Sequence, residues 1–378
     1  MNVLQIVPEL NAGGVERTVL EVDAALAEAG HGSHVASLGG RMEGELRGTL
    51  HRLDMETKNP LRWVGTSRAL RRIIRDHAID IVHARSRAPA WPARAVAKRE
   101  GAAWVTTYHG VYNAPDGPLG VPKRAYNAVM ASGDVVIANS AFTRDHVISR
   151  HGTPPERIRV VPRGVDMLRF DPARVARAEA LTLRREWGVA RDATLWVLPG
   201  RLTGWKGQRV AIAALEHAPG AHLVCIGDAQ GREGYLAELA ALAAKLGVAD
   251  RVALVGHSAD MPAVYAAADV VLSASTDPEA FGRVGAEAQA MGRPVVASAH
   301  GGALETVEDG RTGVLVPPGD ARALAEGCAR ALAMEFDAAY ARARIAERFS
   351  DAALKARVLA IYGELVAGPV ERKGSTLP

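Results

Sequence analysis

The chain has 378 residues, 48% of them apolar, which is enough to bury a large core and favours two domains over one. Its two cysteines, Cys225 and Cys328, are too few for a disulfide framework, and we expect both to be structural thiols. The sequence has no apolar run near the roughly 20 residues of a membrane span and no basic leader. Composition therefore excludes disulfide-rich and membrane-spanning classes and favours a globular, cytoplasmic protein.

The net charge of +4 is unevenly spread along the chain. Residues 1–170 carry 23 Lys and Arg against 17 Asp and Glu, whereas the remainder carries 23 against 25. A basic front half suits an anionic partner, such as a phosphorylated glycan or the cytoplasmic face of an inner membrane, although solubility alone would also explain it. The sequence has no dominant basic cluster interleaved with aromatic residues, so nucleic acid is not an expected partner.

In the first half of the chain, short apolar strands alternate with amphipathic helices, the pattern of βαβ units in a parallel sheet. Helices are expected to open near Gly14, Leu61, Ala88, Pro122 and Ser140. The expected strands are 3–7, 34–38, 79–82, 104–107, 135–138 and 158–161.

A second series of the same kind follows a weaker stretch, and we expect a domain at 1–170, a linker at 171–192 and a domain at 193–349. Residues 350–378 are expected to form a last helix that packs back on the first domain, with Ser350 as its cap, followed by a disordered tail. The second domain is expected to hold strands at 195–199, 223–226, 252–255, 270–273, 295–297 and 313–316, and helices near 206–216, 231–246, 260–267, 283–291 and 320–334.

Gly13 and Gly14 lie between the first strand and the first helix. Unhindered amides at the positive end of a helix dipole make an anion site there, although a tight turn without a ligand is an equal alternative. The pair is not the spaced three-glycine fingerprint of dinucleotide binding, which counts against an oxidoreductase.

Two cations lie in the glycine-containing loop at 199–207, directly after an expected strand. Arg201 can grip phosphate oxygens with its planar fork, and Lys206 adds a point charge, so the loop suits a diphosphate. The alternative is a pair of solvated surface cations. The spacing and ending of a P-loop are missing from the segment.

The stretch at 275–292 holds two carboxylates, Glu279 and Glu287, separated by seven residues. A helix that begins near Gly282 leaves the amides of Phe281, Gly282 and Arg283 free to donate to hydroxyl or phosphate oxygens. The carboxylates would accept from hydroxyl groups. In isolation, Glu279 could equally be a first-turn acid and Glu287 an ordinary residue on a helix surface.

This Glu, seven residues, Glu stretch resembles the signature of the family-four glycosyltransferases, which share the GT-B fold. Other matching pieces follow the family order: GGVER at 13–17, TYHG at 107–110, VIANS at 136–140, IRVVPRGVD at 158–166, GR at 200–201 with KG at 206–207, GG at 301–302 before Glu305, and GRTGVLVPPGD at 310–320. The likeness spans nearly the whole chain. It implies an α/β protein of two Rossmann-like, doubly wound parallel-sheet domains facing across a cleft, the first on the acceptor side and the second binding the donor.

The resemblance also implies roles for the residues of the donor site. Arg201 and Lys206 would bind the diphosphate of a UDP-, GDP- or ADP-sugar, and Glu287 the ribose. Glu279 and the amides of Phe281 and Gly282 would bind the transferred sugar. Gly13 and Gly14 would bind the phosphates, and His109 would lie near the donor sugar. The loops at Asp228 and His257 would bind the base.

The implied reaction is transfer with retention, by front-face attack in which the leaving phosphate takes the acceptor proton. No cofactor is expected. An Asp-x-Asp pair is missing from the sequence, which agrees with a site without metal. One departure from the family pattern is Arg163, where many relatives have Asn, so we assign it no role; it could alter phosphate or acceptor recognition or pair with Asp166.

Candidate contacts to a glycan or lipid-linked acceptor are Arg85 and Arg87, because they follow an expected strand at its carboxyl end. A separate arginine stripe on the helix at 61–77 is either a solvated face or a membrane contact; it comprises Arg68, Arg71, Arg72 and Arg75. Runs at 58–61, 83–91 and 107–112 resemble a bacterial subgroup of lipopolysaccharide-core or polysaccharide assembly that includes mannosyl transfer. A nucleotide-sugar epimerase and a non-catalytic glycan- or nucleotide-binding protein are the alternatives.

Overall fold

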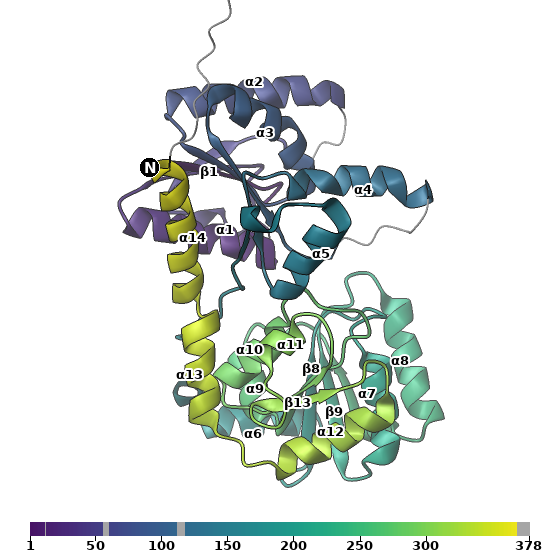
Figure 1. Cartoon of the computed structure of the whole chain (residues 1–378). Coiled ribbons are helices and arrows are strands. Elements are labelled where there is room, and N and C mark those ends of the chain that lie inside the picture. Colours follow the sequence, from purple (N-terminus) through teal and green to yellow (C-terminus); the bar gives the residue numbers. More distant parts are fainter. Residues whose placement is uncertain (12, 56–59, 112–117, 369–378) are drawn as a thin grey trace, which may run out of the picture. The chain divides into compact units, whose positions relative to one another are not determined.

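The structure is a computed structural model that describes every residue except 12, 56–59, 112–117 and 369–378, and does not describe the side chains of 60–62 and 118. Contacts divide the chain into two compact units. Unit 1 comprises Met1–Arg163 and Ala352–Pro378, and unit 2 comprises Gly164–Asp351. In each unit, helices cover both faces of a parallel sheet (Figure 1).

The sheet of unit 1 has seven parallel strands in the order β3-β2-β1-β4-β5-β6-β7. Its strands are β1 (Asn2–Ile6), β2 (Gly32–Ser37), β3 (Thr49–Arg52), β4 (Ile81–Ala84), β5 (Ala103–Tyr108), β6 (Val135–Ala138) and β7 (Ile158–Val160). The helices are α1 (Gly14–Glu28), α2 (Pro60–Asp76), α3 (Arg87–Glu100), α4 (Val121–Ala128), α5 (Ala141–His151) and α14 (Asp351–Ala367).

Alternate residues of these strands build a separate core on each face of the sheet, as the period of two along a strand requires. Leu4, Val82 and Trp104 belong to the core on one face. On the other face, Val3, Ile81 and Val105 pack with the apolar residues of α14, which are Leu354, Val358, Ile361 and Tyr362. The last helix of the chain therefore completes the core of unit 1.

The sheet of unit 2 has six parallel strands in the order β10-β9-β8-β11-β12-β13. Its strands are β8 (Thr194–Pro199), β9 (Ala221–Ile226), β10 (Val252–Val255), β11 (Val270–Ser273), β12 (Val295–Ser298) and β13 (Gly313–Val316). The helices are α6 (Arg177–Glu186), α7 (Gln208–Ala214), α8 (Glu233–Lys245), α9 (Met261–Ala267), α10 (Arg283–Ala290), α11 (Ala303–Thr306), α12 (Ala321–Ala333) and α13 (Ala338–Phe349).

The predicted fold class, two Rossmann-like doubly wound parallel sheets, is confirmed. The expected strands at 135–138, 252–255, 270–273 and 313–316 match the observed ones residue for residue. Strand β3 was not predicted, because Thr49–Arg52 is a polar edge strand whose side chains are exposed or half-buried. The division into functional domains stays a prediction, and the structure adds that η5 (Pro172–Arg174) and α6 lie within the expected linker and belong to unit 2.

Both cysteines are buried and free, as expected for structural thiols, and burial raises the pKa of Cys225 to about 12. In the part of the chain that the structure describes, no helix is long and apolar enough to cross a membrane. The expected disordered tail, residues 374–378, lies outside the described residues.

Candidate active site

The donor-site residues predicted from sequence lie at the point where the strand order of unit 2 reverses. Strands β8 and β11 are neighbours in the sheet, and the chain leaves them toward opposite edges. Ligands of open parallel sheets bind outside the carboxyl ends of the strands at such a point. The loops that follow these two strands carry Lys206 and Glu279, which are 73 residues apart in sequence.

The loop after β8 is pressed against the loop after β11. Gly207 has φ +83°, and a Cβ atom there would lie only 1.9 Å from the carbonyl oxygen of Ala274. The amide of Thr276 donates to the carbonyl oxygen of Trp205 over 2.7 Å. Only glycine allows both the positive φ and this close approach, so Gly207 holds the two loops in register.

Lys206 and Glu279 form an ion pair at this junction. Lys206 Nζ donates to Glu279 Oε1 over 2.7 Å, and the side chains are only 14% and 15% exposed. Ser275 Oγ donates to the same carboxylate oxygen. Lys206 Nζ also lies 4.6 Å from the centre of the Trp205 ring. The two predicted residues are therefore brought together, with Lys206 between a carboxylate and an aromatic face.

The loop after β12 supports Glu279 from the other side. The amide of Gly302 donates to the carbonyl oxygen of Glu279 over 2.7 Å. A Cβ atom at Gly301 would come within 2.4 Å of that oxygen, and one at Gly302 within 2.4 Å of the Phe281 Cα. The glycine pair is thus required for close backbone packing against the carboxylate-bearing loop.

Helix α10 begins at Arg283, and Gly282 caps it with φ +81°. This agrees with the start expected from sequence. The side chain of Phe281 is 4% exposed and packs edge-on against Phe349, so only its backbone can contact a ligand. The amino end of α10 follows Glu279 directly, which places helix-terminal amides and a carboxylate on the same loop.

Glu287 lies one turn into α10, where Tyr265 orients its carboxylate. The Tyr265 hydroxyl, supplied by α9, donates to Glu287 Oε2 over 2.8 Å. Burial raises the pKa of Glu287, while Arg283 and the Tyr265 hydrogen bond oppose that rise. Sequence reasoning missed Tyr265, because it lies 22 residues from Glu287 and no local pattern joins them.

The remaining predicted donor residues follow neighbouring strands at the same edge of the sheet. Arg201 follows β8, Asp228 follows β9 and His257 follows β10, and all three are exposed. The carbonyl oxygen of Asp228 accepts from the amide of Leu202, which ties this loop to the loop after β8. Their positions suit contact with a ligand that extends from the switch point over β9 and β10.

In unit 1, the predicted glycines lie at the amino end of α1. Gly13 has φ +147°, and Gly14 is the first residue of the helix. The Glu16 carboxylate lies where a Cβ atom on Gly13 would be, since the two would be 2.4 Å apart. An acidic side chain of the first turn therefore sits beside the positive end of the helix dipole.

His109 follows β5 and lies beside Arg163, the residue that departs from the family pattern. Arg163 Nη2 is 3.4 Å from His109 Nδ1. Burial lowers the pKa of His109 well below its usual range, and the charges of Arg163 and then Arg85 lower it further. His109 Nε2 is buried without a hydrogen-bond partner among the described residues. Since Asn139 Nδ2 donates to the His109 carbonyl oxygen, the family-like run at 136–140 also holds this histidine.

The two arginines predicted to contact the acceptor lie in different settings. Arg85 is only 2% exposed, and it donates to the Gln5 side chain and to Thr107 Oγ1. Arg87 opens α3 and donates to the Asn127 side chain over 2.8 Å. The structure therefore places Arg85 in an internal polar network, which sequence position alone did not indicate.

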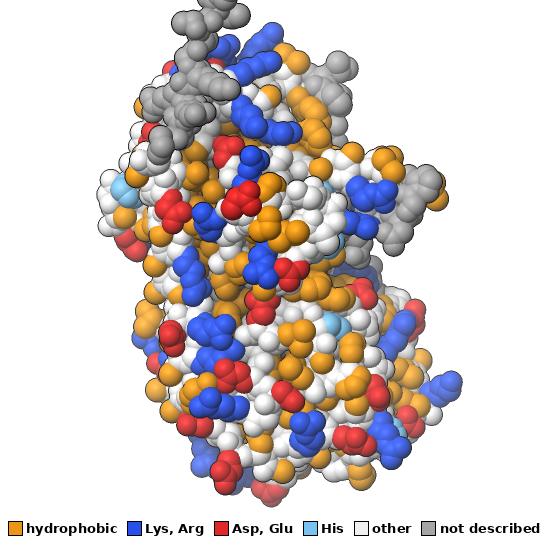
Figure 2. Space-filling model, viewed as in Figure 1, with side chains coloured by type: hydrophobic (Ala, Val, Ile, Leu, Met, Phe, Trp, Pro, Cys, Tyr) orange, Lys and Arg blue, Asp and Glu red, His pale blue; other side chains and the backbone are white. Residues whose placement is uncertain are grey.

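The arginine stripe on α2 is partly neutralised. Arg71 and Arg75 each form a hydrogen-bonded ion pair of 2.6 Å with Glu100 at the end of α3. On the face of the molecule shown in Figure 2, basic and acidic side chains are interspersed. Two of the four stripe arginines are thus engaged in pairs that join α2 to α3.

Two family models match the chain in sequence order. Residues 12–169 match the model described as "Glycosyltransferase Family 4", and residues 181–353 match "Glycosyl transferases group 1". The second model covers every strand of the unit 2 sheet and both members of the Lys206–Glu279 pair, and the first covers all strands of the unit 1 sheet except β1. The chain therefore belongs to this family of glycosyltransferases, as its motifs predicted.

Individual relatives agree with this assignment. The chain is 41% identical over 203 residues to a D-inositol 3-phosphate glycosyltransferase from Xylanimonas cellulosilytica, a match covering 52% of this chain and 48% of that protein. The chain spans about half the length of the curated relatives it matches. It is 32% identical to a glycosyltransferase from Rickettsia africae, with a TM-score of 0.86 and coverage of 97% and 99%. Anabaena Alr3699/HepE in complex with UDP and glucose is 25% identical, with a TM-score of 0.80 and coverage of 96% and 99%.

Proposed function

We propose that the chain is a retaining glycosyltransferase that moves a sugar from a nucleoside diphosphate sugar to a hydroxyl group of a glycan or lipid-linked acceptor, without a metal. The observation that carries the proposal is the Lys206–Glu279 pair at the switch point of unit 2. A cation and a hydroxyl-accepting carboxylate, 2.7 Å apart beside a helix amino end, match the two halves of a sugar diphosphate.

The donor would extend along the carboxyl edge of unit 2. Lys206 and Arg201 would bind the diphosphate, and Glu279 with the amides of Phe281 and Gly282 would bind hydroxyl groups of the sugar. Glu287, held by Tyr265, would accept from the ribose hydroxyl groups. The base would lie toward the loops at Asp228 and His257. The complex of HepE with UDP and glucose, which has the same fold, supports this choice of ligand.

In unit 1, His109 is suited to donate a hydrogen bond to a ligand oxygen. Because the Arg163 guanidinium donates to Nδ1, the proton of the neutral ring resides on Nε2. That nitrogen is buried and has no partner among the described residues. We assign the Nε2 proton to an oxygen of the donor, and the amides of Gly13 and Gly14 to phosphate oxygens.

In the proposed reaction, the bond between the anomeric carbon and the diphosphate oxygen breaks while the acceptor oxygen bonds to the same face of that carbon. The acceptor proton passes to the leaving phosphate. Lys206 and Arg201 stabilise the negative charge that develops on the phosphate, which is the role preorganised cations play in such transition states.

The acceptor stays less defined than the donor. Arg87 remains our candidate contact, and Arg85 is assigned to support the loop of His109 through Thr107, because its donors are engaged inside unit 1. Contact with an inner membrane, lipopolysaccharide-core or polysaccharide assembly and mannosyl transfer stay predictions.

Donor binding is tested by the melting temperature of the purified chain with UDP, GDP, ADP and their sugars, because a bound ligand stabilises by mass action. The diphosphate that raises the melting temperature most identifies the donor class. Lys206→Ala should abolish the rise, whereas Arg209→Ala, which removes an exposed cation paired with Glu238 on α8, should leave it intact. Equal rises for both variants would contradict the proposed phosphate site.

Catalysis is tested by incubation of the preferred sugar nucleotide with and without a glycolipid extract as acceptor. We expect release of the nucleoside diphosphate to depend on the acceptor, and the product to keep the anomeric configuration of the donor. Epimer formation from the sugar nucleotide alone would favour an epimerase. Two results together would favour a non-catalytic binding protein. The chain would bind the sugar nucleotide without turnover, and Glu279→Ala would leave its cellular function unchanged.

A further inference from the structure

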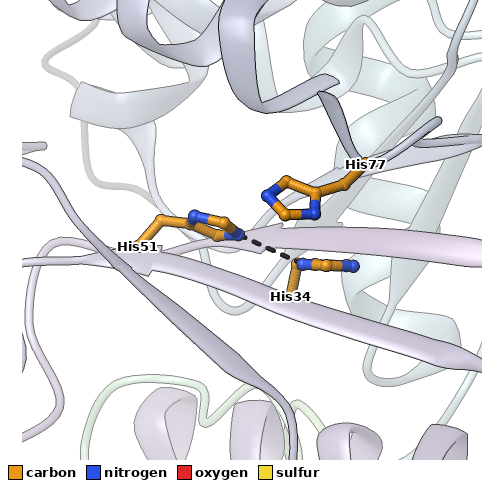
Figure 3. A group of neighbouring side chains, drawn as sticks. All are labelled: His34, His51 and His77. Carbon is orange, nitrogen blue, oxygen red and sulfur yellow. Dashed lines mark hydrogen bonds between the residues drawn. The ribbon is translucent and has the colours of Figure 1, made fainter. Parts of the chain in front are cut away.

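Three histidines meet in unit 1, on elements that the proposed transfer reaction does not use. His34 lies in β2, His51 in β3, and His77 directly after the end of α2. One ring nitrogen of each lies within 4.8 Å of those of the other two. Figure 3 shows the three rings turned toward one another. In the part of the chain that the structure describes, this is the one group of three or more histidine, cysteine or acidic residues with such spacing.

The fold brings these side chains together through strand register and the end of a helix. Ala36 of β2 pairs with His51 of β3, so His34 and His51 point to the same face of the sheet. His77 reaches them from the end of α2, where Asn2 Nδ2 donates to its carbonyl oxygen over 3.0 Å. Strand register therefore places His34 and His51, and a hydrogen bond from the Asn2 side chain holds the backbone of His77.

The spacing of the rings suits a metal ion. His34 Nδ1 and His51 Nε2 are 3.1 Å apart. The ring centre of His77 lies 4.6 Å from that of His34 and 4.9 Å from that of His51. Two imidazole nitrogens on a tetrahedral Zn²⁺, each at about 2.0–2.1 Å, are separated by about 3.3 Å. One ring nitrogen of each histidine lies within 4.8 Å of those of the other two, and His77 is exposed, so its ring has room to turn toward the other two.

The chemistry of the side chains also suits a metal ion. Imidazole nitrogen is a common ligand of Zn²⁺, Ni²⁺ and Cu²⁺. His34 and His51 are half-buried and His77 is exposed, so the group lies at the surface of unit 1, where an ion can enter.

We propose that His34, His51 and His77 bind one divalent transition-metal ion of the zinc type, with the fourth position open to water beside the exposed His77. The ion would join the edge strand β3 and its neighbour β2 to the end of α2. His77 lies near Asn2 at the amino end of β1, whereas His109 lies beyond the carboxyl end of β5, so the ion is separate from the transfer chemistry. Its role would be to stabilise the sheet edge of unit 1.

The test uses the full chain without a histidine tag, stripped with a chelator and desalted. Titration with Zn²⁺ in a calorimeter should give one ion per chain with a Kd of about 1 µM or lower. Co²⁺ should produce the intense visible absorption of a tetrahedral site. Saturation with Zn²⁺ should raise the melting temperature by about 3 °C or more.

His77→Ala is the informative variant, because its side chain is exposed at a helix end and its loss should leave the fold intact. We expect it to weaken Zn²⁺ binding at least about tenfold and to remove the Co²⁺ band. His31→Ala, three residues from His34, is the matched control and should bind Zn²⁺ as the unaltered chain does. The proposal is overturned if the unaltered chain binds no Zn²⁺ at 100 times that Kd, about 100 µM, or if both variants lose binding equally.

Discussion

The two sheets have related topologies, but the polar groups at their carboxyl edges differ. The edge of unit 2 carries charged side chains: Lys206 and Glu279 are 14% and 15% exposed, and Arg201 is exposed. The edge of unit 1 instead buries its polar groups, including Arg85 at 2% exposure and the unpartnered Nε2 of His109.

The difference shows how one topology supports two tasks. A charged edge can bind an anion by direct ion pairing, whereas a buried edge can hold one neutral donor, His109, in a fixed tautomer. The strand order 3-2-1-4-5-6 is common to both sheets and explains neither property. The loops after the strands decide the chemistry, which is why function follows from the site and not from the fold.

The largest expected effect falls on the charged edge. Lys206→Ala should lower kcat about 10²- to 10³-fold, because it removes the cation that we propose stabilises the leaving phosphate. The assay is nucleoside diphosphate release with a competent acceptor. Arg209→Ala, on the following helix and exposed, should retain nearly full activity. An unchanged kcat in Lys206→Ala would remove the distinction drawn between the two edges.

The next effect concerns the packing that holds the charged loops. Gly207→Ala should lower the free energy of unfolding by about 3 kcal/mol or more, because the added methyl group overlaps the Ala274 carbonyl. Gly188→Ala is the matched control, with a similar φ of +71° but open space around the Cβ position. It should cost about 1 kcal/mol. Denaturant titrations measure both, and equal losses would contradict the close-approach argument.

On the buried edge, His109→Gln should lower kcat about 10- to 100-fold. This is the effect expected when one hydrogen bond to a charged group is lost, here the proposed bond from His109 Nε2 to the donor. His31→Gln serves as the control and should be silent in this assay. A normal kcat in His109→Gln would restrict the active chemistry to unit 2.

The charge of Arg163 should also govern how His109 titrates. Burial and then the charge of Arg163 hold the His109 pKa well below its usual range, so kcat of the unaltered chain should show no histidine step near the ordinary pKa. Arg163→Asn removes that charge, so the His109 pKa should rise and kcat should acquire a dependence on pH on the acid side. Identical pH profiles for the two proteins would refute this electrostatic coupling.

The smallest expected effect is on donor affinity. Glu287→Gln should raise the donor KM about three- to tenfold, since a carboxylate accepts hydroxyl protons more strongly than an amide. The Glu287 pKa is raised, so its carboxylate is protonated at a higher pH than an ordinary carboxylate. As the pH is lowered, the donor affinity of the unaltered chain should therefore begin to fall earlier than an ordinary pKa would predict. The variant should lack that dependence, and Glu326→Gln, on the exposed face of α12, should behave as the unaltered chain.

The same shift predicts the effect of Glu287→Gln on stability. A carboxyl whose pKa is higher in the folded state than in the unfolded state destabilises the fold once the pH exceeds the unfolded value. At neutral pH the variant should therefore melt at the same temperature as the unaltered chain or higher. A lower melting temperature would mean that the Tyr265 hydrogen bond outweighs the cost of burial.

The elements and much of the candidate site were predictable from the sequence for a local reason. Apolar runs such as those of β6 and β10 have the length and composition of buried strands, and glycines mark the loops that approach one another. The polar strand β3 was missed because an edge strand lacks that apolar run. Lys206 and Glu279 were predicted from separate segments, and only the resemblance of those segments to the family motifs placed both residues in one site.

The sequence alone thus determined that this chain forms two doubly wound sheets, and it indicated which loops carry the charges that we propose bind the donor. The tertiary structure decided which side chains meet: Tyr265 with Glu287, Arg163 with His109, and the three histidines of unit 1. Hydrophobic periodicity and turn residues act over a few neighbouring positions, so they can be recognised in the sequence. Contacts between distant residues depend on register and packing, which no local pattern encodes.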